Sequence, residues 1–273
     1  MDLVSEIESD PLSTQARYER LEGYAHRHIL GEGGFCCARE DSCRGSVRPE
    51  LVYAAGQLSH VGRHYDISVA GRPLRILVLG MDTGRADSGV TMATRREQVY
   101  ERIPEPFTRR NPHMRGTTLA LRALLGSEDW PTRAGEYFEF HGEPVHVLDG
   151  YAMANLRLCS AIDAGSTRSR GTPVMGRNCL PQLRATIAIL EPTVIVIQGL
   201  NVRREADALI RRVRALSTEL ELAEVADMPV VLASFMHPSY PGPTGNWSWP
   251  TSPYFVDRVL PALRRAQELA LSR

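Results

Sequence analysis

The chain has 273 residues with a formal net charge of zero, and 43% of them are hydrophobic, which is enough to bury a sizeable core. A neutral chain is not expected to coat nucleic acid without specificity. No run of 18 apolar residues is present and the N-terminus is acidic, so we expect a cytoplasmic protein without a membrane partner. We also expect a monomer.

All 32 basic residues are Arg, because the sequence contains no Lys. A bias in coding composition would explain this. Whatever its origin, the chain offers no side-chain amine for Schiff-base chemistry and no P-loop lysine. Any contact to phosphate must come from Arg, from hydroxyl groups or from backbone amides.

Apolar residues at helical spacing among many charges predict an N-terminal helical arm over residues 1–30, followed by one domain over residues 31–273. The polar stretch from Asp82 to about residue 113 contains three prolines, so we expect a long loop there. In the first half of the chain we expect a helix over 49–58, a hairpin of strands over 65–69 and 74–79, a helix over 117–125, and a strand over 145–148 that runs into a loop over 151–158 with Asn155. In the second half we expect a loop over 161–177, a helix over 180–190, a strand over 193–197, a helix over 202–216, a strand over 229–235 and a final helix over 254–271.

Strands alternate with helices along most of this order. Such alternation is typical of parallel strands joined by helical crossovers. We therefore predict a single α/β domain with a mostly parallel central sheet and helices on both faces.

Two buried strands end in residues that carry chemistry. The segment 74–84, LRILVLGMDTG, is an apolar run followed by a tight turn with Asp82, and the strand over 229–235 leads into His237. In open α/β sheets the carboxyl edge binds ligands, and Gly80 would let a ligand approach the backbone there. The alternative is a plain turn in which Asp82 caps its own backbone.

The five cysteines are unevenly spaced. Cys36, Cys37 and Cys43 fall within eight positions of a Gly-rich segment, and Cys159 and Cys179 follow much later. Disulfides are not expected inside the cell, so these thiols either bind metal or fill small spaces in the core.

Four features stand in one order: the turn with Asp82, Asn155 four residues before Cys159, Cys179 ahead of a helix and a buried strand, and the turn His237-Pro238-Ser239. This ordered set resembles the uracil-DNA glycosylase superfamily over about residues 35 to 265. The cysteines make it most similar to the iron–sulfur branch known as family 4.

The resemblance implies a four-iron, four-sulfur cluster held by four thiolates. Cys159 and Cys179 match the second cysteine pair of the family. For the first pair we expect Cys37 and Cys43, with Cys36 as the alternative to Cys37, because the spacing departs from that of the family. Zinc is the alternative metal.

The resemblance also implies catalytic roles. Asp82 would orient water or screen the positive charge that develops on the sugar, and His237 would donate a hydrogen bond to the departing base. Asn155 would read the edge of the flipped base with its amide, beside Gly80 and Met81. As alternatives, Asn155 is a turn residue and His237 only caps its strand.

For the DNA strand, the resemblance implies that Ser239 holds a phosphate and that Tyr240 occupies the place of the flipped base. Trp247 and Trp249 either stack on bases or cover the core. Residues 85–91 lack the aromatic residue on which the family stacks uracil, and Phe107 or Tyr100 would have to replace it.

We therefore expect a monofunctional DNA glycosylase that hydrolyses the N-glycosidic bond of a flipped-out uracil or other modified base. The alternatives are a glycosylase for a bulkier base and a catalytically inactive DNA-binding protein of the same fold.

Overall fold

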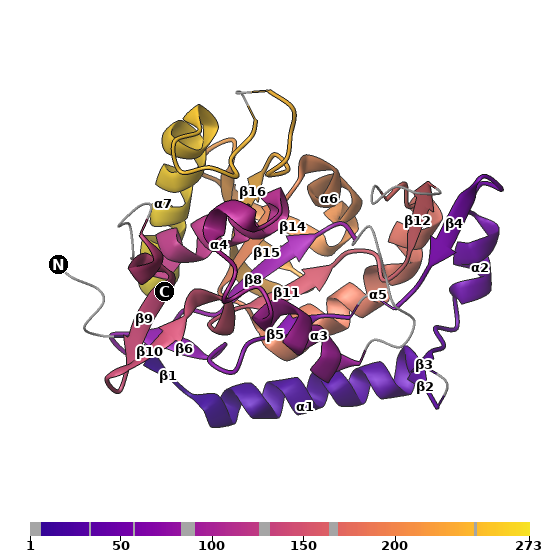
Figure 1. Cartoon of the computed structure of the whole chain (residues 1–273), viewed down its shortest axis with the longest axis horizontal. Coiled ribbons are helices and arrows are strands. Elements are labelled where there is room, and N and C mark those ends of the chain that lie inside the picture. The colour runs from indigo at the N-terminus through magenta and orange to yellow at the C-terminus, as the bar shows by residue number, and fades with distance from the viewer. Residues whose placement is uncertain are drawn as a thin grey trace.

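A computed structural model describes residues 7–32, 34–56, 58–82, 91–125, 132–163, 169–242 and 245–273. The parts of the expected turn and loops at residues 83–90 and 164–168, and residues 1–6 of the expected arm, lie outside this description. The core of the fold is a seven-stranded sheet in the order β14-β15-β16-β13-β8-β11-β5 (Figure 1). Its strands are β5 (His60–Val61), β8 (Ile76–Gly80), β11 (Ala152–Asn155), β13 (Val194–Gln198), β14 (Ile210–Ala215), β15 (Leu220–Val225) and β16 (Met228–Phe235).

The sheet is mixed rather than mostly parallel. The four central strands β16, β13, β8 and β11 are parallel, whereas β14, β15 and β5 pair antiparallel with their neighbours. The α/β class is confirmed, and the parallel arrangement holds for the centre of the sheet. A two-residue turn joins β15 to β16, because Ala226 and Asp227 both adopt positive φ.

Helices cover both faces of the sheet, as expected. Along β8, Leu77 and Leu79 pack in one apolar cluster with residues of α1 (Pro11–His28) and α5 (Pro173–Leu190). Ile76 and Val78 pack in the other, with residues of α4 (Pro112–Leu125) and α7 (Leu260–Leu271). Both faces of the strand are buried, which explains its unbroken apolar sequence.

The predicted N-terminal helix is present as α1, but it does not stand apart from the rest of the fold. Tyr18, Leu21 and Ala25 are buried in the same apolar cluster as α5. The strand β1 (Ile7–Ser9) in front of this helix pairs with β6 (Ile67–Val69). Residues 7–28 therefore contribute to the core.

The predicted helix over 202–216 is wrong beyond its first turn. The helix α6 (Leu200–Glu205) is short, and residues 210–215 form the edge strand β14. Arg211 and Arg212 of this strand form ion pairs with Glu224 and Glu221 of β15. Such pairs between neighbouring strands stabilise a ladder that the helical spacing of the sequence does not reveal.

Three other expectations also need correction. Residues 51–54 form strand β4 (Leu51–Ala54), paired with β12 (Ser160–Asp163), where we expected a helix and a loop. The long polar stretch contains the helix α3 (Met92–Tyr100), which Thr91 caps with a capping box. The hairpin is confirmed, but its turn is residues 70–71 and its second strand is the short β7 (Arg72–Pro73), whereas β8 belongs to the central sheet.

The remaining elements surround this framework. No helix in the described part of the chain is long and apolar enough to cross a membrane. The smaller elements are β2 (Leu30–Gly31), β3 (Gly34–Phe35), α2 (Glu40–Gly45), β7 (Arg72–Pro73), β9 (Tyr137–Phe140), β10 (Glu143–His146), the 3-10 turns Phe107–Arg109, Arg133–Glu136, Val147–Asp149 and Asp207–Leu209, and the π-helical turn Phe255–Val259.

Candidate functional site

The carboxyl edge of the parallel strands brings together three polar side chains from distant parts of the chain. Asn155 ends β11 directly opposite Gly80, the last residue of β8. A Cβ atom on Gly80 would lie 3.2 Å from Asn155 Oδ1 and 3.3 Å from His113 Cε1. Because Gly80 has no Cβ atom, the side chains of Asn155 and His113 can both lie over it.

His113 stacks on His237, with ring centroids 6.3 Å apart and ring planes inclined by 22°. This contact depends on the close approach of α4 to the loop after β16. Gly116, one helical turn after His113, lies against Pro238, where a Cβ atom would be 2.6 Å from the proline Cγ. Gln198 at the end of β13 adds a hydrogen bond from Nε2 to Thr117 at 3.0 Å.

His113 was not among the residues that we expected at this site. Its signal was weak, because a histidine at the start of a helix after a polar stretch has no specific spacing to other site residues. Burial, together with the nearby His237 and Arg95, lowers the pKa of His113 to about 3. The ring is therefore neutral at physiological pH. Within the described residues, no hydrogen bond involves either of its ring nitrogens.

His237 lies at the end of β16, as predicted, and its tautomer is fixed by the turn that follows. The Ser239 backbone N–H donates to His237 Nδ1 at 3.2 Å, and Ser239 Oγ lies 2.8 Å from the same atom. Because a backbone amide can only donate, Nδ1 is the acceptor and the proton of the neutral ring is on Nε2. Desolvation lowers the pKa of His237, so the ring offers an Nε2–H donor.

Asp82 lies two residues beyond Gly80 and is engaged in an ion pair. Its side chain is 7% exposed, and Arg157 Nη1 lies 3.5 Å from Asp82 Oδ2. The same guanidinium donates to Glu205, at 3.2 Å from Nε to Oε2 and through a second, shorter contact from Nη2.

The environment of Asp82 makes its ionised form less favourable than in water. Burial raises the pKa of Asp82 to about 6, against the opposing effects of a hydrogen bond from Ser169 and the charge of Arg157. Glu205 nearby raises it as well. The carboxylate is therefore ionised at neutral pH but titrates close to it.

The structure thus brings together Gly80, Asn155 and His237 as predicted and adds His113. Among the described residues, the hydrogen-bond partners of Asp82 are Arg157 and Ser169 rather than the histidines. Met81 is half-buried and its side chain packs against the apolar core, although its backbone carbonyl accepts from Arg157 N at 2.8 Å.

The aromatic residues of the loop after His237 divide into two kinds. Trp247 is fully buried, packs against Phe235 and donates from Nε1 to the Met236 carbonyl, so its expected role in stacking on DNA is wrong and it covers the core. Tyr240 is 40% exposed and Trp249 is 38% exposed.

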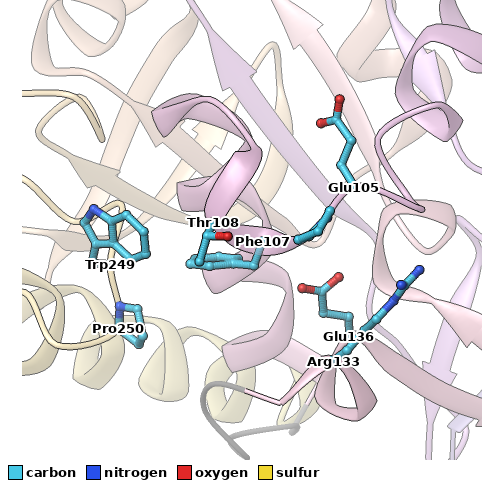
Figure 2. A pocket seen from close by; sticks show the side chains of 8 residues that line it. Glu105, Phe107, Thr108, Arg133, Glu136, Trp249 and Pro250 are labelled. Atoms are coloured by element: carbon cyan, nitrogen blue, oxygen red, sulfur yellow. The ribbon is translucent and has the colours of Figure 1, made fainter.

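Phe107 was expected beside the base. Its ring instead forms an edge contact with Trp249, with centroids 5.8 Å apart. Both rings line a pocket between the 3-10 turn Phe107–Arg109 and the loop after β16 (Figure 2).

Four of the five thiols share one region on the α5 side of the sheet. Cys43, Cys159 and Cys179 are buried in the same cluster, and Cys37 is partly exposed. Burial, together with the like charges of Cys43 and Cys37, raises the pKa of Cys179 to about 12. Burial likewise raises the pKa of Cys159, with contributions from the other three thiols.

Cys36 differs from these four. Its thiol is exposed and packs over Gly31, where a Cβ atom would lie 3.0 Å from Cys36 Sγ. The contacts therefore favour Cys37 over Cys36 as a member of the group.

This donor set is chemically suited to a metal or an iron–sulfur cluster, because a positive centre would replace the repulsion between thiolates by attraction. Among the described residues, however, no group of three or more His, Cys, Asp or Glu side chains is arranged to hold a metal ion. Binding would require the thiols, of which Cys159 contacts the Tyr53 hydroxyl at 3.0 Å, to turn toward a common centre.

Comparison with models of known protein families finds no match, and a search of curated protein sequences finds no significant relative. The geometry of the site is therefore the basis for the function proposed below.

Proposed function

We propose that this protein is a monofunctional DNA glycosylase of the uracil-DNA glycosylase type, acting as a monomer in the cytoplasm on a flipped-out uracil or other modified base. The order of motifs in the sequence supports this proposal. The observation that carries it is the fixed tautomer of His237, which presents an Nε2–H donor at the edge where Asn155 and His113 meet over Gly80.

Such an edge suits the leaving group of the reaction. Cleavage of an N-glycosidic bond places negative charge on the departing base, and a donor held ready for that charge lowers the barrier. The neutral imidazole of His237 carries its proton on Nε2, so it can donate a hydrogen bond to the base oxygen in the protonation state that it already has at pH 7. Asn155 has both a donor and an acceptor in its amide, which is what the Watson–Crick edge of a base requires.

Asp82 supplies the negative charge that the sugar needs as it develops oxocarbenium character. In this role the carboxylate orients a water molecule or screens the cation. Because the chain has no Lys, water is the nucleophile, and the product is an intact strand with an abasic site.

Ser239 and Tyr240 follow His237 on the exposed side of the loop, where a DNA strand would pass. The hydroxyl and amide of Ser239 face His237, so a phosphate there would lie next to the reacting base. Residues 85–90, where the family places the aromatic residue that stacks on uracil, lie outside the described part of the chain, and a base bulkier than uracil is the alternative substrate.

We further propose that Cys37, Cys43, Cys159 and Cys179 hold a four-iron, four-sulfur cluster, with zinc as the alternative. When bound, the cluster would supply a structural tie between the segment around α2 and the sheet, with no part in bond cleavage. The chain's own residues perform the reaction.

One observation favours a second candidate, a DNA-binding protein that has lost catalysis. Asp82 is 7% exposed and paired with Arg157, so its carboxylate is less available than that of a free catalytic acid. If this pair persists when DNA is bound, the site would recognise a base without cleaving its bond.

Abasic-site formation separates the two candidates. Oligonucleotides with one uracil, hypoxanthine, xanthine or alkylated base are incubated with the protein and then cleaved with alkali. We expect strand breaks with at least one of these bases, formed far more slowly by His237→Ala. Binding to the same oligonucleotides without any abasic product would refute the glycosylase and support the binding protein.

A further inference from the structure

A pocket with a volume of about 310 Å³ lies between the 3-10 turn Phe107–Arg109 and the loop after β16 (Figure 2). Phe107 and Trp249 form aromatic walls, with their rings inclined by 76°. Pro106 and Pro250 add apolar surface. The volume is at the lower end of pockets that bind small organic groups, and the walls suit a flat ring.

The carboxylates of this pocket are already neutralised. Glu136 Oε2 accepts from Arg110 Nη2 at 2.7 Å and lies 2.9 Å from His146 Nε2. Glu105 Oε1 accepts from Arg102 Nη1 at 2.7 Å. Among the described residues that line the pocket, therefore, no carboxylate is left unpaired to select a cationic ligand.

Two arginines at the pocket have no carboxylate partner among the described residues. Arg115 places its guanidinium 4.3 Å from the centre of the Trp249 ring, and its hydrogen bonds go to Thr108 O, Arg110 O and Ser248 Oγ. Within the described residues, the one hydrogen bond that the Arg133 side chain donates goes to the carbonyl of Ile103. An aromatic surface beside two cations that have no carboxylate partner in the described part of the chain fits a ligand that joins a flat ring to an anion.

The pocket is connected to the candidate site through the chain itself. The 3-10 turn Phe107–Arg109 leads into α4 with His113, and Trp249 lies on the loop that begins at His237. Arg115 contacts both segments. A strand whose base reaches the two histidines would pass this pocket with a neighbouring nucleotide.

We propose that the pocket binds an unpaired nucleobase that flanks the excised one, with Arg115 and Arg133 at the adjacent phosphate. This inference rests on the proposed glycosylase function, because it assigns the neighbouring nucleotide of the same substrate. A base inside a duplex is stacked on both faces and paired at one edge, so it does not enter such a pocket. The protein should therefore prefer single-stranded DNA or DNA that is unpaired next to the target.

The test measures DNA binding apart from catalysis. A dye-labelled single-stranded 12-mer of unmodified bases and the matching duplex are titrated with the full chain at one salt concentration. We expect the single strand to bind at least tenfold tighter than the duplex. Trp249→Ala should weaken single-strand binding by roughly 5- to 150-fold and duplex binding little, since a stacked base contributes that much to affinity.

Three further variants control this result. Arg133→Ala should also weaken single-strand binding, whereas Arg214→Ala, which removes the same charge from the exposed edge strand β14, should not. Trp249→Phe should retain most of the affinity, and thermal melting confirms that each variant is folded. Equal affinity of the wild type for the two DNA forms, or an unchanged single-strand affinity of both Trp249→Ala and Arg133→Ala, would overturn the inference.

The two proposals fail in different ways. A wild type that forms abasic sites but shows no dependence on Trp249 would remove the pocket and leave the glycosylase. A wild type whose single-strand binding depends on Trp249 but that releases no base would support the pocket within the alternative DNA-binding protein.

Discussion

His113 and His237 stack at the carboxyl edge of the sheet with their ring centroids 6.3 Å apart. The first comes from the start of α4 and the second from the end of β16, so the pair forms only when helix and sheet pack. Two adjacent imidazoles do not both accept protons easily, and burial keeps the pKa of each below its ordinary value. The pair therefore presents neutral rings to a substrate at pH 7.

The first prediction concerns His237. His237→Ala should lower the single-turnover rate of base release on the order of a hundredfold or more, because the donor for the departing base is lost. Ser239→Ala is the matched control. It removes the hydroxyl but retains the backbone N–H that fixes the tautomer, so it should cost much less. Equal losses in the two variants would contradict the role of the tautomer.

The second prediction concerns Asp82. Because burial raises the pKa of this carboxyl to about 6, the rate should fall about tenfold per pH unit below pH 6, as the reactive ionised form is lost. Asp82→Asn should be slower at pH 7 on the order of a hundredfold, without this pH step. A wild-type rate that is constant down to pH 4 would exclude the assignment.

The same shift predicts how stability depends on pH. The folded pKa lies above the ordinary value of 3.8, so the folded chain binds a proton more tightly than the unfolded chain and loses stability as pH rises from about 4 to 6. Asp82→Asn avoids this loss. Its melting temperature at pH 7 should therefore equal or exceed that of the wild type, in contrast to its lower activity.

The third prediction concerns the thiols. Purified protein should be brown with about four irons per chain, since four thiolates are the usual ligands of a cubane cluster. Cys37→Ser, Cys43→Ser, Cys159→Ser and Cys179→Ser should each lose iron, whereas Cys36→Ser should retain it, because that thiol packs over Gly31. Colourless protein with one zinc after anaerobic preparation would instead identify the alternative metal.

The fourth prediction follows from the absence of Lys. Borohydride should trap no covalent adduct with DNA during turnover, because no side-chain amine can form a Schiff base with the opened sugar. The abasic strand should stay intact until alkali is added. An adduct that persists after the N-terminal amine is chemically blocked would refute hydrolysis by water.

The fifth prediction concerns the ion pair under the pocket. Arg110 is fully buried and Glu136 is 3% exposed, so Glu136→Gln should lower the free energy of unfolding by about 3–5 kcal/mol, because a buried charge loses its partner. Glu268→Gln, in an exposed pair with Arg265, should cost less than about 1 kcal/mol. Urea denaturation of both variants makes the comparison.

That ion pair also has a pH signature. Burial raises the pKa of Glu136, but hydrogen bonds from His146 and Arg110 outweigh it, and the pKa lies below its ordinary value. The stabilisation is therefore complete above the ordinary pKa of 4.5 and is lost as pH falls through the lower folded value. If Glu136→Gln lowered the free energy of unfolding by the same amount at acid pH as at neutral pH, this pH dependence would be contradicted.

The sequence by itself determined the central strands and where their chemistry lies. The apolar runs that become β8, β13 and β16 are unbroken because both faces of each strand are covered, and this signal is local. Since parallel strands end at one edge, Asp82 and His237 could be assigned to that edge from their positions alone. Residues 202–216 show the limit of such reasoning, because their helical spacing is overridden by pairing with β15.

Only the tertiary structure decided which side chains face one another. Trp247 and Trp249 are two residues apart and chemically identical, yet the first is fully buried against Phe235 and the second is 38% exposed beside Arg115. His113 reaches His237 only because Gly116 lets α4 approach Pro238. Whether a side chain is exposed, and which side chain it contacts, depends on residues far away in the chain. A local sequence pattern does not predict these contacts.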